Sequence, residues 1–459
     1  MESTKGNKMG TMPIAKLILT MSLPAILSMM VQAMYNIVDS IFVSRINEEA
    51  LTALSLAFPV QLILISAFVG LGVGINSSVS RKLGEGDKKT ATNIAEHGYL
   101  LAGILYLIVA IGGFIFVDDF FNWFTKDPVI LKYCIDYTRI ILVFSFGRIF
   151  AQAGMSILQG SGEMVKPMKA QLIGAISNII LDPILIFGWF GLPAMGVEGA
   201  AIATVLAQFI SMLYVLLVIF RGKEYLKLDP KNFTYSNKIT AGIILVGLPA
   251  TIMQGLVSVM LTGLNLILAC FSDASIAVVG VYFKLQSFIF MPVFGISQGT
   301  MPVIGFNYGA KNKKRIFGAL KFASMIALGY LTLGMVIFLV FPKPLLMIFN
   351  STQEMLDIGI VAFRRMCLMF PFAAITIILC TAFQGMGKAH YSMIVTFIRQ
   401  IIILLPLSWY LGSTFGLDTL WYAFLIAEII GLIMAIYFFR LTYNNVFKNW
   451  DNKIVLGGK

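Results

Sequence analysis

The chain consists of long apolar stretches separated by short polar segments. Twelve stretches of roughly 20 residues or more carry few charges, and an α-helix of that length crosses the ~30 Å hydrocarbon core of a bilayer. Only 12% of the 459 residues are charged, compared with about 25% in a typical soluble protein. The sequence therefore predicts an all-α integral membrane protein. The twelve transmembrane helices are expected at residues 14–38, 51–76, 95–117, 134–158, 168–190, 198–220, 240–270, 275–304, 318–341, 358–383, 391–411 and 418–440.

Basic residues indicate the orientation of these spans. If the N-terminus is cytoplasmic, only four of the 34 Lys and Arg residues lie in segments on the outer side, namely Arg45, Lys126, Lys132 and Lys343. Cytoplasmic loops of membrane proteins carry an excess of Lys and Arg. We therefore expect a multi-pass membrane protein with both termini in the cytoplasm. The net charge of +12 then reflects topology and does not indicate a nucleic-acid partner.

The sequence lacks the residue patterns of an enzyme or of an ATP-driven pump. No GK[ST] motif follows a glycine at the spacing of a phosphate-binding loop, and no Ser–His–Asp set can be placed on facing spans. The four cysteines are scattered through apolar segments, and only two histidines are present, which argues against disulfides and a metal centre. We expect no enzymatic activity and no cofactor other than a coupling ion.

The two halves of the chain are related by a constant shift of 225 residues. LPAILSMMVQ from Leu23 matches LPATIMQGLV from Leu248, and ILQGSG from Ile157 matches AFQGMG from Ala382. The shift carries the first span onto the seventh, so the repeats have the same orientation in the membrane, as in two-lobed secondary transporters. The expected parts are an N-terminal lobe (1–220), a cytoplasmic linker (221–239), a C-terminal lobe (240–441) and a cytoplasmic tail (442–459).

The first repeat contains intramembrane polar residues that the second replaces. Asp39, Asn178 and Asp182 each correspond to a leucine or isoleucine in the second repeat. Carboxylates at membrane depth are costly and usually mark an ion or proton pathway. Asn178 and Asp182 share one helix face, and Pro183 withholds a backbone N–H there. Two carboxylates and an amide oxygen form a hard oxygen site suited to Na⁺, or to H⁺ by protonation of a buried Asp.

A structural explanation of these charges stays open. Each Asp could instead pair with a buried arginine such as Arg139 or Arg148, or lie in a water-filled vestibule. In the second repeat, Lys284, Arg399 and Glu428 are explained at least as well by structural pairing or by snorkelling to the interface.

Another group of residues is a candidate lining for a substrate cavity. Polar side chains within the spans can face such a cavity or bond neighbouring helices. The segments SMMVQAMY and SFIFMPVF combine Met with aromatic residues, and flexible thioethers suit varied apolar ligands. The candidates are Gln32, Met34, Tyr35, Asn76, Lys284 and Met291.

Several motifs together resemble the multidrug and toxic compound extrusion (MATE) family. They are SLPAILSMMVQAMYNIVDSIFVSR, GEGD, QGSG, NIILDPILIFG and GVEGAAIATVLAQ. YFKLQSFIFMPVFGISQGTMPVIGFNYGAKN is most similar to the MepA-like bacterial branch. The resemblance covers nearly the whole chain. It implies two six-helix lobes and a functional monomer that exports lipophilic, mainly cationic compounds in exchange for inward Na⁺ or H⁺ by alternating access.

The resemblance also implies a cation site in the N-terminal lobe. The matching residues are Asp39, Asn178 and Asp182, with Thr204 and the Ala200 carbonyl as further contributors. Another branch of the family keeps acidic residues in spans 7 and 10, but those spans have none here, so coupling through the second lobe is not implied. The expected partners are small-molecule drugs, cations and membrane lipids. The main alternative is a lipid-linked oligosaccharide flippase or other exporter of the same superfamily, and a flippase would need several basic residues in its cavity.

Overall fold

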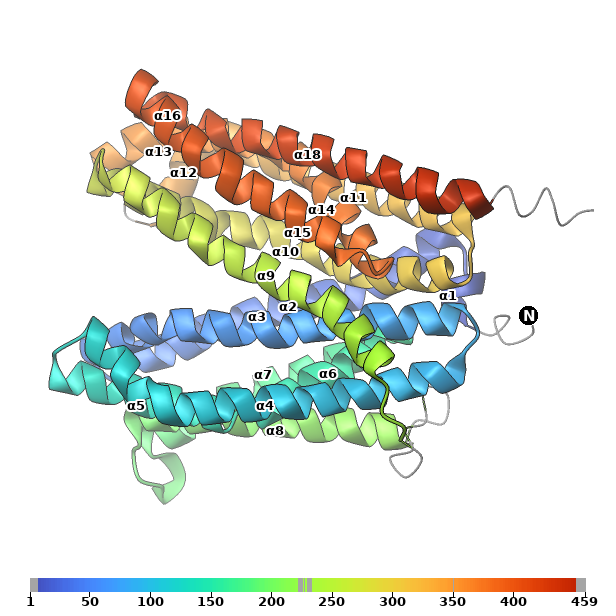
Figure 1. Ribbon diagram of the computed structural model, residues 1–459. Helices are drawn as coiled ribbons and strands as arrows, with labels where there is room; N and C mark the ends of the chain where they lie inside the picture. The colour runs from blue at the N-terminus through green and yellow to red at the C-terminus, as the bar shows by residue number, and fades with distance from the viewer. Residues whose placement is uncertain (1–6, 222–225, 227, 229–232, 350, 451–459) are drawn as a thin grey trace, which may run out of the picture. The chain divides into compact units, whose positions relative to one another are not determined.

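The computed structural model describes residues 7–221, 226, 228, 233–349 and 351–450, and each regular element within them is helical (Figure 1). Parts of the predicted linker (221–239) and tail (442–459) lie outside the described residues. The α-helices are α1 (Lys8–Thr11), α2 (Ile14–Ser44), α3 (Glu48–Gly84), α4 (Lys88–Phe124), α5 (Pro128–Val143), α6 (Phe146–Gly160), α7 (Val165–Phe187), α8 (Gly196–Arg221), α9 (Asn237–Ala269), α10 (Asp273–Gly309), α11 (Lys313–Val340), α12 (Pro342–Met347), α13 (Gln353–Met366), α14 (Phe370–Gly385), α15 (Ala389–Phe397), α16 (Leu405–Phe415), α17 (Leu417–Leu420) and α18 (Tyr422–Thr442). The remaining turns are the 3-10 turns η2 (Trp189–Gly191) and η4 (Cys367–Met369) and the π-helical turns η5 (Ile398–Leu404) and η6 (Tyr443–Phe447).

The helices account for the predicted membrane spans. Within the described residues, 11 helices are long and apolar enough to cross a membrane, or 12 if one bent pair forms a single span. That pair is α5 and α6, which are bent by 45°, so the span predicted at 134–158 consists of two helices. Phe144 leaves helical geometry there (φ −101°, ψ 21°). Ser145 and Gly147 flank α6's first residue, and sharp kinks are common at Gly and Ser.

Matching caps begin two helices that start one repeat apart. The Asp87 carboxylate accepts a hydrogen bond from the Thr90 backbone N–H at the start of α4 (3.0 Å). The Asn312 side chain accepts one from the Arg315 backbone N–H at the start of α11 (3.2 Å). Each cap satisfies one of the N–H groups that a helix leaves free. Hydrogen bonds from the Thr90 side chain and backbone lower the pKa of Asp87 below its usual range.

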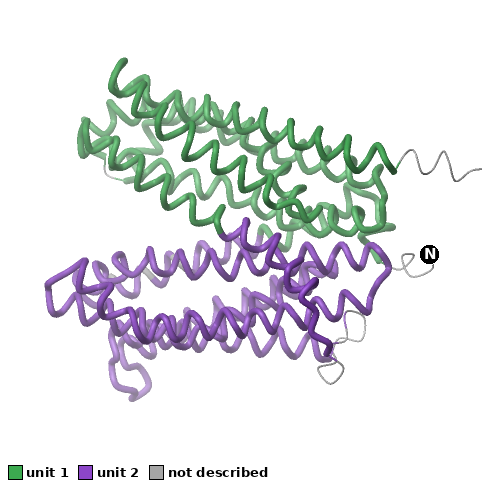
Figure 2. The backbone as a smooth tube through the Cα atoms, in the orientation of Figure 1, with its two compact units in different colours: residues 1–26, 252–459 green, residues 27–251 purple. Residues whose placement is uncertain are grey.

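The chain divides into two compact units (Figure 2). Unit 2 is Leu27–Thr251, and unit 1 combines Met1–Ile26 with Ile252–Lys459. Both division points lie inside a helix, one in α2 and one in α9, and they are one repeat length apart. The division thus follows the internal repeat. The lobe boundaries expected at residues 220 and 240 stay predictions.

Unit 1 has an aromatic core, and a separate hydrogen bond holds its first helix. The fully buried Tyr282 ring lies 5.7 Å from the Phe338 ring and 5.6 Å from the Phe363 ring, centroid to centroid. Both pairs meet edge to face, an arrangement that aromatic rings favour. The Asn307 side chain donates a hydrogen bond to the Met9 carbonyl (3.0 Å), so α1 is fixed to α10 within this unit.

Unit 1 also contains a buried ion pair. The Arg399 guanidinium, in η5, lies 2.6 Å from the Glu428 carboxylate, in α18, and the two side chains are 21% and 4% exposed. Gly431 permits this contact, because a Cβ there would lie 2.9 Å from Cδ of Arg399. The pairing agrees with the structural explanation of these two charges. Lys284 is exposed, and its ammonium group lies 5.9 Å from the centre of the Phe349 ring.

Candidate functional site: oxygen ligands beside a polar pocket

In unit 2, α7 and α8 approach closely enough for their polar side chains to bond. Gly199 permits the approach, since a Cβ there would lie 2.5 Å from the Leu185 carbonyl oxygen. Asn178 Nδ2, on α7, donates hydrogen bonds to Thr204 Oγ1 on α8 (3.3 Å) and to Asp182 Oδ1 one turn along α7 (3.1 Å). The amide nitrogen is therefore engaged twice, which leaves the amide oxygen free to act as a ligand.

Three oxygen atoms of this cluster are buried without a hydrogen-bond partner. They are Asp39 Oδ1, Asn178 Oδ1 and Asp182 Oδ2. Asp182 is 0% exposed and Asn178 is 2% exposed. A buried polar atom without a partner costs about 1–3 kcal/mol, and such atoms are rare in native structures. A hard cation such as Na⁺, or a proton on a carboxylate, would satisfy these oxygens.

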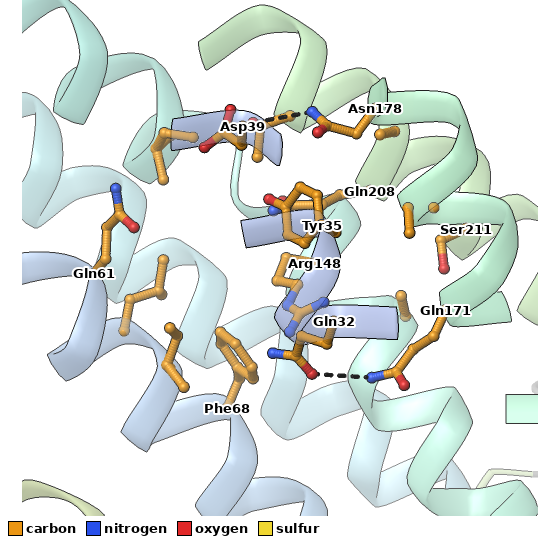
Figure 3. Close-up of a pocket in the computed structure, with 18 of the residues that line it drawn as sticks. Gln32, Tyr35, Asp39, Gln61, Phe68, Arg148, Gln171, Asn178, Gln208 and Ser211 are labelled. Carbon is orange, nitrogen blue, oxygen red and sulfur yellow. Dashed lines mark hydrogen bonds between the residues drawn. The ribbon is translucent and has the colours of Figure 1, made fainter. Parts of the chain in front are cut away.

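A cavity of about 160 Å³ lies beside this cluster. Figure 3 shows Asp39 and Asn178 at one end of the pocket, Gln32 and Gln171 at the other, and Arg148 between them. Hydrophobic residues of α3 and α5 complete the wall. The polar lining residues are Gln32, Tyr35, Asp39, Gln61, Tyr137, Arg148, Gln171, Asn178, Thr204, Gln208 and Ser211.

The arginines proposed as structural partners of the aspartates do not fill that role. Arg139 pairs instead with Asp118 (2.5 Å). Arg148 lies over the Phe68 ring, with its guanidinium carbon 4.9 Å from the ring centroid. Within the described part of the chain, no Asp or Glu forms an ion pair with Arg148. Among the described residues, Asp39 and Asp182 therefore form no ion pair with Arg139 or Arg148.

The structure brings together four of the five residues predicted to bind the coupling cation. Asp39, Asn178 and Thr204 line the same pocket, and Asp182 is bonded to Asn178 behind it. Ala200 lies one turn before Thr204 on α8, is fully buried and does not line the pocket. Binding of a cation by these residues stays a prediction.

The predicted substrate-cavity residues are only partly brought together. Gln32 and Tyr35 line the pocket. Met34 does not and is 64% exposed, because consecutive residues of a helix face different directions. Asn76 is buried away from the pocket and donates a hydrogen bond to Gln159 Oε1 (3.4 Å). The two candidates beyond residue 251 belong to unit 1.

Several pocket residues were not singled out from the sequence. Gln61 donates a hydrogen bond to the Tyr137 hydroxyl (3.2 Å), and Gln208 lines the wall from α8. Arg148 had been considered only as a partner for an aspartate. The sequence could have identified Arg148 as a candidate for function, because the shift that relates the repeats places this charged residue on the apolar Ala373. The glutamines gave no such signal, since many intramembrane amides only bond neighbouring helices.

Relatives of this chain are named as multidrug resistance, export or transport proteins. A probable multidrug resistance protein NorM from Thermotoga maritima is 28% identical over 458 residues, covering 96% of this chain and 94% of that protein. The multidrug export protein MepA from Staphylococcus haemolyticus is 26% identical over 432 residues, covering 92% and 93%. An FAD transporter from Shewanella oneidensis is 28% identical over 400 residues, covering 86% and 88%.

Solved structures share the fold over almost the whole chain. An outward-facing multidrug resistance MATE family transporter of the MOP superfamily aligns with a TM-score of 0.89 at 27% identity, covering 97% of this chain and 98% of that one. A MOP superfamily transporter from Pyrococcus furiosus, described as having a binding pocket of reverse polarity, aligns with a TM-score of 0.88 at 26% identity, again covering 97% and 98%. These matches confirm the predicted fold.

The family assignment follows from a model that matches the chain twice. The MatE model matches residues 24–184 and again residues 249–410. The two matches begin 225 residues apart, which is the shift of the internal repeat, and together they cover more than half of the chain. The protein is thus a multi-pass membrane transporter and not an enzyme, and the chain belongs to the MATE family.

Proposed function

We propose that this transporter is a secondary antiporter that exports lipophilic, mainly cationic compounds in exchange for inward Na⁺ or H⁺. The coupling ion binds at the oxygen cluster of unit 2, and binding favours one conformation of the transporter while the exported compound favours another. The protein lies in a bacterial inner membrane with both termini in the cytoplasm.

One observation carries this proposal: Asp39 Oδ1, Asn178 Oδ1 and Asp182 Oδ2 are buried and have no hydrogen-bond partner. Neither Asp39 nor Asp182 forms an ion pair among the described residues, and carboxylates at membrane depth usually mark an ion or proton pathway. The second repeat has apolar residues at the corresponding positions, so a fold of this kind does not require them. The names of the NorM and MepA relatives support a multidrug substrate range.

The test is dye transport in proteoliposomes of purified protein. Tetramethylrhodamine methyl ester, a lipophilic fluorescent cation, is the substrate, and a Na⁺ or a proton gradient is imposed in turn. We expect one of the two gradients to drive transport by the wild type. Asp182→Asn keeps the size of the side chain but removes its charge, so we expect gradient-driven transport to fall by about 100-fold or more, as for the loss of a buried charge–ligand contact.

A matched control separates the site from the general effect of losing a carboxylate. Asp136→Asn makes the same chemical change on α5, outside the pocket lining, and we expect it to transport like the wild type. Near-normal transport by Asp182→Asn would contradict the proposed ion site.

The alternative within the superfamily is a flippase for a lipid-linked oligosaccharide. Such a protein needs several basic groups to hold a pyrophosphate, whereas the unit 2 pocket has one, Arg148. Absence of gradient-driven dye transport by the wild type would favour this alternative. The next assay would then be translocation of a lipid-linked substrate in the same liposomes.

A further inference from the structure

Arg148 places a positive charge in the pocket wall without an anionic partner. No Asp or Glu of the described residues forms an ion pair with it, and its contact on one side is the Phe68 ring. It lies in the first turn of α6, where free backbone N–H groups add positive potential. A guanidinium without a counter-charge is costly inside a protein. A ligand is therefore the missing partner that best explains its retention.

Three amide side chains around the pocket form hydrogen bonds within its lining. Gln171 donates a hydrogen bond to Gln32 (3.4 Å) at one end of the pocket, and Gln61 donates one to Tyr137 (3.2 Å) on the opposite wall. The Arg148 guanidinium carries five N–H donors and no acceptor, and it supplies the positive charge of the pocket lining. Its planar fork matches the paired oxygens of a carboxylate or a phosphate.

The size of the pocket limits the group that can accompany this anion. The cavity volume is about 160 Å³, and an apolar cavity of about 150 Å³ holds one benzene molecule. Phe68, Leu64 and Ile141 provide apolar wall, and aromatic rings pack favourably at 4.5–7 Å between centroids. One flat ring with an anionic substituent therefore fits the cavity, and the rest of a larger molecule would extend beyond it.

The acidic cluster does not compete with Arg148 for the same ligand group. Asp39 lies at one end of the pocket, whereas Arg148 lies between the two ends (Figure 3). A cation and an anion can therefore each find an oppositely charged group. The position of Arg148 in the other repeat is Ala373, which is 1% exposed, so the repeated helical framework does not depend on an arginine there.

We propose that Arg148 is a substrate-binding residue that holds the carboxylate or phosphate of an aromatic compound. This proposal rests on the transport function proposed above and extends its substrate class to zwitterionic and anionic ring compounds. The ion site and the Arg148 subsite use different residues, so one assignment can fail while the other stands.

The test measures binding without any ion gradient. Purified full-length protein in detergent is titrated against two dyes, and binding is followed by fluorescence anisotropy. Tetramethylrhodamine carries a free benzoate, and its methyl ester has the same ring system without that negative charge. The variants are Arg148→Gln, which removes the charge, and Arg148→Lys, which keeps the charge but loses the planar fork. Arg364→Gln, a charge deletion in unit 1, is the control.

Binding of the free acid is expected to depend on Arg148, and binding of the ester is not. Loss of a charged hydrogen-bond donor costs about 1.5–3 kcal/mol, so Arg148→Gln should weaken binding of the acid by about 10- to 100-fold. Binding of the ester should stay unchanged, Arg148→Lys should bind the acid with intermediate affinity, and Arg364→Gln should resemble the wild type. Competition by benzoate and by phenyl phosphate then distinguishes a carboxylate from a phosphate as the preferred group.

Three results would overturn the proposal. They are failure of the wild type to bind the acid, unchanged binding of the acid by Arg148→Gln, and equal weakening of both dyes by that variant. Thermal unfolding of each variant identifies a general loss of structure, and Arg148→Lys keeps the test decisive if Arg148→Gln is unstable. If ion-driven export of the ester persists in Arg148→Gln while these results are negative, the Arg148 subsite alone is wrong.

Discussion

The two units bury charged side chains in opposite ways. In unit 1, Arg399 and Glu428 pair with each other at 2.6 Å. In unit 2, neither Asp182 nor Arg148 forms an ion pair among the described residues, and Arg148 lines a pocket. The Arg399–Glu428 pair neutralises its own charges, whereas unpaired charges at membrane depth usually mark something that the protein binds.

Because of the repeat, the two units can be compared residue by residue. Pocket residues of unit 2 correspond to apolar residues that are buried in unit 1, among them Leu264, Ala362 and Ala373. Their counterparts are Asp39, Tyr137 and Arg148, in that order. One helical framework thus accepts either a polar pocket or an apolar core at the same positions, so the polar pocket is an addition to the fold.

The largest expected effect comes from breaking the ion pair of unit 1. Glu428→Leu leaves the Arg399 guanidinium buried without its partner, which should lower the free energy of unfolding by about 3–5 kcal/mol. Adding Arg399→Met removes the stranded charge and should restore the free energy of unfolding to within about 1 kcal/mol of the wild type. Chemical denaturation in mixed micelles measures both variants. Equal losses in the single and double variants would show that packing, not the charge, makes this position important.

In unit 2, a gain in stability is expected when a residue of the second repeat replaces its counterpart in the first. Asp39→Leu installs the residue found at position 264 and removes a buried oxygen that has no partner. The free energy of unfolding should rise by about 1–2 kcal/mol, while gradient-driven dye transport is lost. The same denaturation and transport assays measure the two changes. A large loss of stability in Asp39→Leu would show that this carboxylate has a structural role and would weaken the contrast between the units.

The smallest expected change in stability comes from removing either of the two helix caps. Asp87→Ala and Asn312→Ala should each cost about 1 kcal/mol at neutral pH, whereas Asp87→Asn should cost little, because Asn caps a helix equally well. The pKa of Asp87 is lowered in the folded protein, so the unfolded chain binds the proton more tightly and stability rises with pH in acid.

The acid dependence of the two caps should therefore differ. The contribution from the lowered pKa of Asp87 is complete above the ordinary Asp pKa of about 3.9 and is lost as the pH falls through the lower value. Thermal unfolding from neutral pH to about pH 3 should show a smaller acid loss in Asp87→Asn than in the wild type. An Asn312→Asp variant, whose cap donor is the Arg315 backbone N–H, should gain acid dependence. If it gains none, the hydrogen bond from the Thr90 side chain, and not the cap bond from the backbone N–H, causes the shift at Asp87.

The sequence predicted the helices and the oxygen cluster for separate physical reasons. Apolar length alone defines a membrane span, and the repeat gave an internal control that selected Asp39, Asn178 and Asp182. The bend between α5 and α6 could not be predicted, because Ser and Gly are tolerated in many straight membrane helices. The position of Met34 outside the pocket depends on how α2 is rotated within its unit, and a single sequence does not specify that rotation.

The bend between α5 and α6 also has a consequence for hydration. A break in a membrane helix frees backbone carbonyl and N–H groups that lipid tails cannot satisfy. Ser145, at the break, is 1% exposed, and Arg148, one turn later, lines the pocket. The chain itself satisfies part of this need, since the Phe144 and Ser145 backbone N–H groups donate to the Ile140 and Leu142 carbonyls. Any group still free at the break must be satisfied by protein or by enclosed water, and Arg148 brings the polar pocket next to that point of the bilayer.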